Sequence, residues 1–301
     1  MKITNKLGLS EAFVAAVTND PYTKGASDIS VTELWSPPQQ RALVRANYGA
    51  LEEDAADRVW SLWGSAMHYV LERAGRDVVG HIFEERISTS FEGWKISGQP
   101  DALALRSGIL TDFKNVSVWS IVKGSRSEDW SLQLSTYAWL LRRQSEPFEV
   151  TSLSVEAILR DWSKLEARRN PTYPRHQVHK EAVELIPDGK LTELIRERLK
   201  DHAAEVSRPC TPEECWQKPP VWAVMKPGKD RAVKLHQTYD EATAWIAAWG
   251  KPRENMYIEE REAKRTRCES YCAAAPFCPQ FKEWQVSRGE LVEDATNGDM
   301  L

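Results

Sequence analysis

The chain has 301 residues, of which 42% are hydrophobic and 28% are charged, a composition that excludes a disordered protein and predicts a globular one. Its formal net charge of −4 excludes a uniformly basic nucleic-acid-binding protein, although a local basic surface would suffice for contact with phosphates. The sequence has neither a run of about 20 apolar residues for a membrane span nor a signal peptide pattern, so we expect a soluble, cytoplasmic protein with no membrane partner.

The first elements along the chain are expected to be helices. The segment Ser30-Val31-Thr32-Glu33 is typical of a capped helix start, and Pro37-Pro38 predicts a break soon after it. Residues 50–75 predict one long helix, whose apolar stripe at steps of three and four residues consists of Trp60, Trp63, Met67 and Leu71. Gly64 predicts a close approach of another backbone to this helix, and we expect the two tryptophans to pack in the core.

A β region follows the long helix. Residues 82–96 predict strand structure with a turn at Glu92-Gly93. Residues 98–105 and 109–116 predict a hairpin, since Arg106-Ser107-Gly108 between them is a turn signal. The later periodic segments are a helix at residues 130–142, a strand at 150–159 and a helix at 191–204.

Two stretches of the first two hundred residues are candidates for contact with a nucleic acid. Trp119 and Trp130 flank a charged loop that contains Lys123 and Arg126, and aromatic side chains can stack on unpaired bases. Between residues 160 and 180 basic residues outnumber acidic ones, and we take Arg168 and Arg169 as candidate phosphate contacts. A solvated charged face is the alternative interpretation.

The composition changes after Pro209, and all five cysteines follow that point. Residues 219–262 predict a small ββαβ insert, in which Pro227-Gly228 marks a hairpin turn and Thr238-x-x-Glu241 opens a helix. The cysteine number is odd, which argues against a disulfide framework. We expect a core at residues 1–205, a cysteine region at 206–285 and a flexible tail at 286–301.

Cys268, Cys272 and Cys278 form a dense group of thiols near the C-terminus. A zinc ribbon usually has paired Cys-x2-Cys spacings, which are absent from this sequence. An iron-sulfur cluster needs four thiolates, so Cys210 or Cys215 must supply the fourth. We favour Cys210, because a thiol in a loop reaches a metal more easily than one inside a helix. Zinc, and no metal at all, are the alternatives.

Asp112 and Lys114 lie two residues apart on one expected strand, so their side chains point to the same face. The hairpin can bring Asp101, on the preceding strand, beside Asp112. Two carboxylates and an ammonium group on one face are best accommodated by a divalent cation, and oxygen ligands favour Mg²⁺ or Mn²⁺. Lys114 could then orient or deprotonate a water for attack on phosphorus. An exposed ion pair on a strand is the alternative.

These residues belong to a longer series: Gly64-x-x-x-His68, Gly98-x-Pro100-Asp101, Asp112-Phe113-Lys114 and Gln133-x-x-x-Tyr137. In this order they resemble the PD-(D/E)xK nuclease superfamily, over roughly residues 30 to 160 and the cysteine region. The most similar branch is the RecB-like one, which includes iron-sulfur CRISPR-associated exonucleases and many phage-encoded relatives.

The resemblance implies a restriction-endonuclease-like α/β fold, with a mixed sheet flanked by helices. It implies a nuclease core at residues 1–205 and a divalent metal bound by His68, Asp101, Asp112 and the main-chain carbonyl of Phe113. Lys114 would be the catalytic lysine. Gln133 and Tyr137 would shape the site and contact the DNA strand, with Glu72 as a supporting residue.

The same branch implies a 4Fe-4S cluster with one distant cysteine and three cysteines close together, here Cys210 with Cys268, Cys272 and Cys278. In many relatives the distant cysteine precedes the nuclease core, whereas no cysteine of this chain precedes residue 210. This departure leaves the fourth ligand open between Cys210 and Cys215.

The function implied is a Mg²⁺- or Mn²⁺-dependent deoxyribonuclease of DNA processing or recombination, an exonuclease rather than an endonuclease, in a bacterial or phage-infected cell. The sequence contains no Walker A motif, so a helicase or annealing protein would be a separate chain. A non-catalytic DNA-binding or assembly protein and a nuclease acting on RNA stay open as alternatives.

Overall fold

The computed structural model describes residues 1–19, 24–124, 126–204, 207–249 and 255–291. Contacts within the chain divide it into two compact units. The first unit comprises residues 1–36 and 48–207, and the second comprises residues 37–47 and 208–301. The larger part of the expected tail, residues 292–301, lies outside the described residues.

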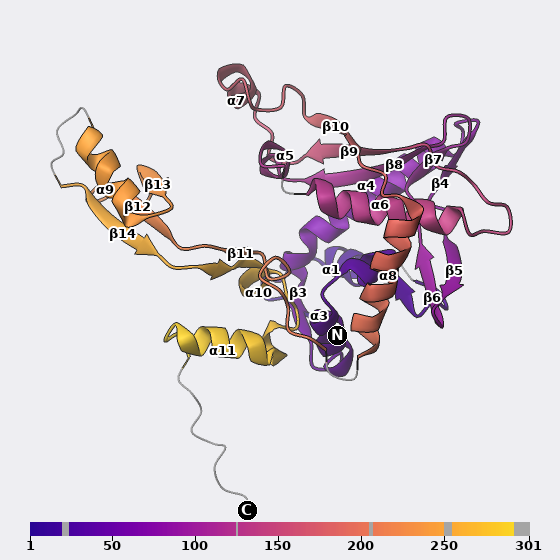
Figure 1. Cartoon of the computed structure of the whole chain (residues 1–301), viewed down its shortest axis with the longest axis horizontal. Coiled ribbons are helices and arrows are strands. Elements are labelled where there is room, and N and C mark those ends of the chain that lie inside the picture. The colour runs from indigo at the N-terminus through magenta and orange to yellow at the C-terminus, as the bar shows by residue number, and fades with distance from the viewer. Residues whose placement is uncertain (20–23, 125, 205–206, 250–254, 292–301) are drawn as a thin grey trace, which may run out of the picture. The chain divides into compact units, whose positions relative to one another are not determined.

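The first unit is built around a five-stranded sheet in the order β10-β9-β8-β7-β4 (Figure 1). β8 and β9 run parallel and the other neighbours are antiparallel, so the sheet is mixed. Its strands are β4 (His81–Phe83), β7 (Ala102–Ala104), β8 (Ile109–Val116), β9 (Ser152–Leu159) and β10 (Val178–Val183).

Two smaller sheets accompany it in the described part of this unit. One is a parallel pair, and the other has three strands in the order β2-β6-β5. Their strands are β1 (Lys2–Thr4), β3 (Glu52–Asp54), β2 (Ile29–Ser30), β5 (Ile87–Phe91) and β6 (Trp94–Gly98). The predicted turn joins β5 to β6, where Glu92 and Gly93 both adopt positive φ angles.

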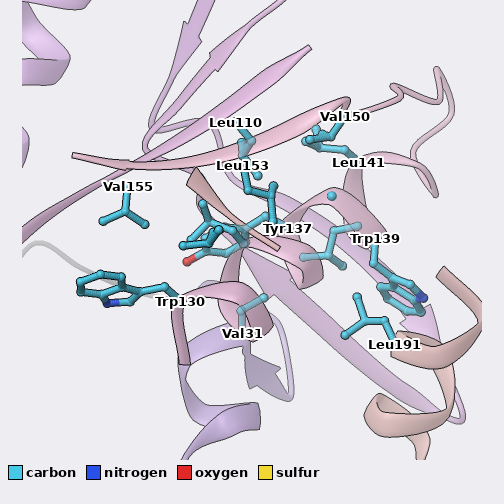
Figure 2. Packing of buried hydrophobic residues seen from close by; sticks show 14 of the residues in the cluster. Val31, Leu110, Trp130, Tyr137, Trp139, Leu141, Val150, Leu153, Val155 and Leu191 are labelled. Carbon is cyan, nitrogen blue, oxygen red and sulfur yellow. The ribbon is translucent and has the colours of Figure 1, made fainter. Parts of the chain in front are cut away.

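Helix α6 (Ser127–Leu141) forms the centre of the core (Figure 2). Ten of its 15 residues are buried, so it is covered on almost every side. Trp139 and Leu140 are fully buried, and the apolar side chains of Leu110 and Leu153 come from β8 and β9. This packing gives the side chains of α6 fixed positions relative to β8.

The other helices of the first unit lie around these sheets. They are α1 (Glu11–Thr18), α2 (Val31–Trp35), the 3-10 turn η1 (Ala55–Arg58), α4 (Val59–Gly75), α5 (Val118–Val122), α7 (Lys164–Arg169) and α8 (Asp188–Ala203). The predicted capping box is present, since the Ser30 hydroxyl accepts from the Glu33 N–H and the Glu33 carboxylate accepts from the Ser30 N–H.

Two expectations for α4 are wrong. A Cβ at Gly64 would meet no atom within 4 Å, so no other backbone approaches that position. The close approach is at Gly75, where a Cβ would lie 2.5 Å from the ring of Phe83. Trp60 and Trp63 do not pack in the core but are exposed, because α4 lies at the surface and Gly75 is its only buried residue.

The second unit contains the expected ββαβ insert. Its sheet has the order β13-β12-β14, with both pairs antiparallel, and α9 contacts all three strands. The insert consists of β12 (Val221–Met225), β13 (Lys234–His236), α9 (Tyr239–Ala248) and β14 (Tyr257–Arg261). The Thr238 hydroxyl caps α9 by accepting from the Glu241 N–H.

The remaining elements of the second unit surround the cysteines. They are α3 (Pro38–Ala46), β11 (Gln217–Lys218), β15 (Lys264–Arg265), α10 (Thr266–Ser270), the 3-10 turn η2 (Ala275–Phe277) and α11 (Pro279–Ser287). β11 and β15 pair antiparallel.

The predicted fold class, a mixed sheet flanked by helices, is confirmed and is compatible with a restriction-endonuclease-like fold. Among the described helices, none combines the length and the apolar character needed to cross a membrane.

Candidate functional site

The hairpin of β7 and β8 brings Asp101 and Asp112 together. Ala102 pairs with Thr111, so positions 101 and 112 face one another one step further along the ladder. Asp101 is 6% exposed and Asp112 is 2% exposed. Asp101 is held in place by the main chain, since its Oδ2 accepts from the Phe113 N–H at 2.6 Å. The juxtaposition expected from the sequence is therefore present.

Lys114 reaches the same place from the next inward position of β8. Its Nζ lies 2.6 Å from Asp112 Oδ2 and donates to Gln133 Oε1 at 3.2 Å. The Gln133 amide in turn donates to the Tyr137 hydroxyl at 2.9 Å and lies 3.5 Å from Asp112 Oδ1. The buried helix α6 thus fixes the lysine through Gln133.

His68 approaches the carboxylates from α4. Its Nδ1 lies 2.9 Å from Glu84 Oε1 and 3.5 Å from Asp101 Oδ1. The ligand atoms of His68, Glu84 and Asp101 all lie within 4.8 Å of one another, so these residues could share one metal ion. The structure thus groups the expected His68 and Asp101 with a carboxylate that the sequence did not single out.

Glu84 lies just after β4, at the edge of this group. Its N–H donates to the Asp101 carbonyl at 3.2 Å, and its Oε2 accepts from the Gln99 amide at 2.9 Å. Its φ of 50° is unusual for a residue other than glycine. The sequence placed this residue inside a continuous strand, and no periodic signal marks the break in pairing at this point.

The charges at this site perturb one another. Burial, followed by the Asp112 charge, raises the pKa of Asp101 to about 8. Burial alone would lower the pKa of Lys114, but the carboxylates of Asp112 and Asp101 outweigh it and raise that pKa. The hydrogen bond with Glu84 raises the pKa of His68. Such a concentration of buried carboxylates is an environment that a divalent cation stabilises.

The other predicted residues have varied positions. Trp119, Lys123, Arg168 and Arg169 are exposed, as contact with a nucleic acid requires. Arg126 is half-buried, with a guanidinium 3.9 Å from Asp129. Glu72 pairs with Arg76 at 2.7 Å, and no contact described in the structure joins it to the carboxylate group.

The prediction for Trp130 is wrong. This residue was expected to contact DNA, but its side chain is buried in the core beside Val155 and Tyr137 (Figure 2). It lies in the first turn of α6, on the side of that turn that is directed into the molecule, whereas its neighbours Glu128 and Asp129 are exposed.

The five cysteines gather at a second place, inside the second unit. Cys210, Cys215, Cys268, Cys272 and Cys278 all line one cavity, together with residues of α3 and α11. Cys215 is buried, and hydrogen bonds with the Cys210 and Cys268 thiols lower its pKa. The thiol donors suit a soft or borderline metal or an iron-sulfur cluster.

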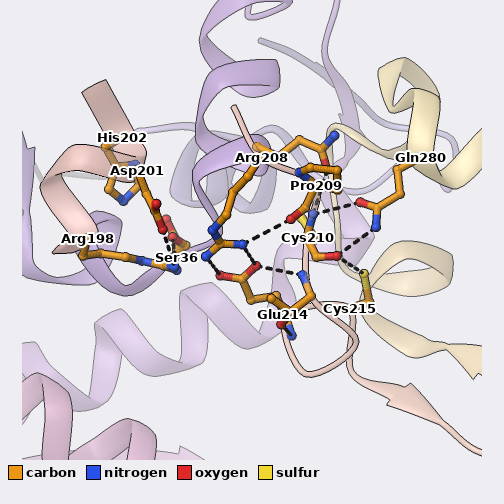
Figure 3. A network of polar contacts seen from close by, with 12 residues as sticks. Ser36, Arg198, Asp201, His202, Arg208, Pro209, Cys210, Glu214, Cys215 and Gln280 are labelled. Carbon is orange, nitrogen blue, oxygen red and sulfur yellow. Dashed lines mark hydrogen bonds and ion pairs between the residues drawn. The ribbon is translucent and has the colours of Figure 1, made fainter. Parts of the chain in front are cut away.

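Two glutamines fix the main chain at Cys210, and Figure 3 labels one of them, Gln280. The Cys210 N–H donates to Gln280 Oε1 at 2.9 Å and lies 3.2 Å from Gln39 Oε1. The Gln280 amide donates to the Cys210 carbonyl at 2.8 Å. Glu214 also anchors this loop, accepting two hydrogen bonds from Arg208 at 2.7 and 2.9 Å. The segment that carries Cys210 is therefore tied to helices distant in sequence.

Comparisons with known proteins assign the chain to no family. No protein-family model and no curated protein matches it. The crystal structure of SSO0001 is 17% identical with a TM-score of 0.47, and the match covers 68% of this chain and 90% of that one. A phage-related exonuclease from Haemophilus somnus 129PT is 13% identical with a TM-score of 0.32, covering 47% and 67% of the two chains.

Proposed function

We propose that this protein is a Mg²⁺- or Mn²⁺-dependent nuclease that hydrolyses phosphodiester bonds in DNA. The observation that carries the proposal is that the buried Asp101 and Asp112 lie beside Lys114 on one hairpin. His68 and Glu84 lie next to them. Carboxylates and a lysine in this arrangement suit metal-assisted phosphoryl chemistry.

Asp101, Asp112, His68 and Glu84 would hold the metal, with the Phe113 carbonyl as a further oxygen donor. When bound, Mg²⁺ or Mn²⁺ supplies polarisation of a phosphoryl oxygen and stabilises the charge that develops on it. The Lys114 pKa is raised, so this side chain is an ammonium group that can orient a water or donate to a phosphate oxygen. Gln133 holds that ammonium in place at 3.2 Å.

The direct test is a cleavage assay on end-labelled linear DNA with Mg²⁺ or Mn²⁺. We expect Lys114→Ala to lower the rate by about 10²-fold or more while the protein stays folded. Lys2→Ala is the matched control, because this exposed lysine of β1 pairs with Glu52 at 2.9 Å, lies outside every candidate contact region and should leave the rate unchanged. Absence of cleavage with either metal would overturn the proposal and favour a non-catalytic DNA-binding protein.

Two substrate comparisons refine the activity. We propose an exonuclease, which should degrade linear DNA and spare a covalently closed circle of the same sequence. Cleavage of the circle would indicate an endonuclease instead. A matched RNA substrate in the same assay decides between DNA and RNA as the preferred chain.

We further propose that the cysteine cavity holds a 4Fe-4S cluster bound by Cys210, Cys268, Cys272 and Cys278, with zinc as the alternative metal. The proposal rests on five thiols around one cavity, one more than a cluster needs. Anaerobically purified protein should then be brown, with an absorption band at about 400 nm. Comparing Cys210→Ala with Cys215→Ala identifies the fourth ligand by which substitution bleaches that band. Colourless protein that contains zinc would contradict the iron-sulfur proposal.

A further inference from the structure

Helix α4, which carries His68, exposes aromatic side chains along one flank. Trp60 and Trp63 are 54% and 59% exposed, and Val70 follows on the same flank at helical spacing. Side chains as large as tryptophan are usually buried to a large extent. These two are not part of the core cluster of the first unit. Exposed aromatic side chains on the helix that also places His68 beside Asp101 therefore indicate a binding surface.

The guanidinium group of Arg160 lies on this flank, next to the end of β8. The Arg160 guanidinium carbon lies 4.3 Å from the centroid of the Trp60 ring. The Arg160 N–H donates to the Val116 carbonyl at 3.1 Å, and Val116 is the last residue of β8. The pair of Arg160 and Trp60 is thus attached to the strand that carries Asp112 and Lys114.

A third exposed tryptophan is held at the same end of the sheet. Trp119 belongs to α5, whose start is fixed by Asp161: its carboxylate accepts from the Ser117 hydroxyl at 2.7 Å and from the Val118 N–H at 2.6 Å. The Trp119 ring contacts buried Tyr173 edge-on, with centroids 6.3 Å apart. About half of Trp119 stays exposed, so it can still contact a ligand.

Basic side chains surround these rings. α5 and α7 lie at the same end of the five-stranded sheet (Figure 1). The exposed cations on and next to them are Lys123, Lys164, Arg168 and Arg169, against the exposed acids Asp161 and Glu166. A protein or lipid partner would be matched by an apolar patch, but aromatic rings interspersed with cations match a chain of bases and phosphates.

We propose that Trp60, Trp63 and Trp119, with Arg160, form a stacking surface for an unpaired polynucleotide strand. The inference rests on the proposed nuclease function in one respect, namely that the bound strand continues toward the carboxylates as a cleavage site. Bases would stack on the rings while phosphates meet Arg160 and the lysines and arginines of α5 and α7. Trp60 and His68 are roughly 12 Å apart along the helix axis, so a strand bound here leads to the carboxylates.

The test is binding of a short fluorescent oligo(dT), measured by anisotropy in EDTA so that no cleavage occurs, with oligo(rU) and a duplex hairpin in parallel. We expect Trp60→Ala and Trp63→Ala each to weaken binding of both single strands by about fivefold or more. Tyr69→Ala is the matched control, since Tyr69 is 60% exposed on the opposite flank of α4. It should bind as the wild type does.

Equal affinity of the two tryptophan variants, Tyr69→Ala and the wild type would overturn the inference. It would also fall if the tryptophan variants kept oligonucleotide binding but lost self-association or sedimentation with lipid vesicles, because the flank would then serve a protein or a membrane. Tryptophan-dependent binding in a protein that never cleaves DNA would leave the stacking surface standing and refute the nuclease proposal alone.

Discussion

A substitution at Glu84 can distinguish a metal site from a buried ion pair with His68. Its carboxylate lies 2.9 Å from His68 and is oriented by Gln99 from the other side. If it helps to hold a metal, Glu84→Gln should raise the Mn²⁺ concentration that gives half-maximal cleavage by about tenfold or more. A Mn²⁺ titration of the cleavage rate measures this shift.

Glu85→Gln is the control for that titration, because Glu85 is the exposed neighbour of Glu84. Its Mn²⁺ dependence should match that of the wild type. If Glu84→Gln had the same Mn²⁺ dependence as well, Glu84 would be a structural partner of His68 and no part of a metal site.

The sequence predicted part of this site and missed part of it, for physical reasons. Asp112 and Lys114 follow from strand alternation, and Asp101 follows from the hairpin turn, because both rules are local. His68 came from a resemblance, since a helical histidine has no spacing of its own. Glu84 was missed because its contacts join segments that are distant in sequence. Trp130 was misplaced because a helix start beside a charged loop does not reveal which face is covered.

At the scale of single elements, the two glycines of α4 give a matched pair. A Cβ at Gly75 would clash with the Phe83 ring at 2.5 Å, whereas one at Gly64 would meet nothing within 4 Å. We expect Gly64→Ala to raise the free energy of unfolding by up to about 1 kcal/mol, because alanine favours a helix. Gly75→Ala should lower it by about 1–3 kcal/mol through overpacking. Urea denaturation followed by circular dichroism distinguishes the two, and a stabilising Gly75→Ala would contradict the packing described.

Two arginines that follow the last residue of α6 form ion pairs with Asp188 of α8, and the strength of these contacts depends on pH. Asp188 accepts from Arg143 at 2.9 and 3.0 Å and from Arg142 at 2.7 Å. The hydrogen bond with Arg143, then that with Arg142, lowers the pKa of Asp188 to about 2, against the opposing effect of partial burial. Because the folded-state pKa lies below the unfolded one, this stabilisation is complete above the unfolded value and is lost as the pH falls toward 2.

Asp188→Asn should therefore destabilise the protein at neutral pH by about 1 kcal/mol, a modest value because more than a third of the Asp188 side chain is exposed and screened. The difference from the wild type should shrink as unfolding is measured at progressively lower pH, between about 4 and 2. A difference that stayed constant over that range would show that the carboxylate charge contributes nothing to this contact.

Elements with a strong local signal were predicted well, and those that depend on tertiary pairing were not. The hairpin of β7 and β8, the capping box of α2 and the ββαβ insert each have a turn or cap in the sequence. Edge strand β10 was missed, because its residues read as part of a basic stretch and pair only with distant β9. The predicted helix at residues 50–75 begins only at Val59, because residues 52–54 pair with β1 instead.

At the scale of the whole molecule, the cysteine cavity brings together segments far apart in the chain. Residues of α3, the Cys210 loop and the C-terminal helices all line it, although residues 48–207 of the first unit separate α3 from Cys210 in sequence. A cluster there would cross-link these distant segments. Its loss should therefore unfold the second unit before it lowers the nuclease activity. Neither the participation of α3 nor the gathering of all five thiols could be predicted from cysteine spacing.

Cys272→Ala tests this structural role. We expect a colourless, poorly soluble protein with a lower melting temperature, because one ligand to the cluster is lost. Substituting the exposed Ser270 with alanine is the control and should keep both colour and stability. A Cys272→Ala protein that kept its fold and lost only nuclease activity would contradict the structural role and point to a catalytic one.

Calorimetric titration with Mn²⁺ tests most directly whether the buried carboxylates form a metal site. The wild type should bind at least one ion per chain, since burial of two carboxylates at 6% and 2% exposure favours a divalent partner. Asp112→Asn should abolish that binding while the circular dichroism spectrum stays unchanged. Equal binding by the wild type and Asp112→Asn, or no binding by either, would contradict the proposed catalytic centre.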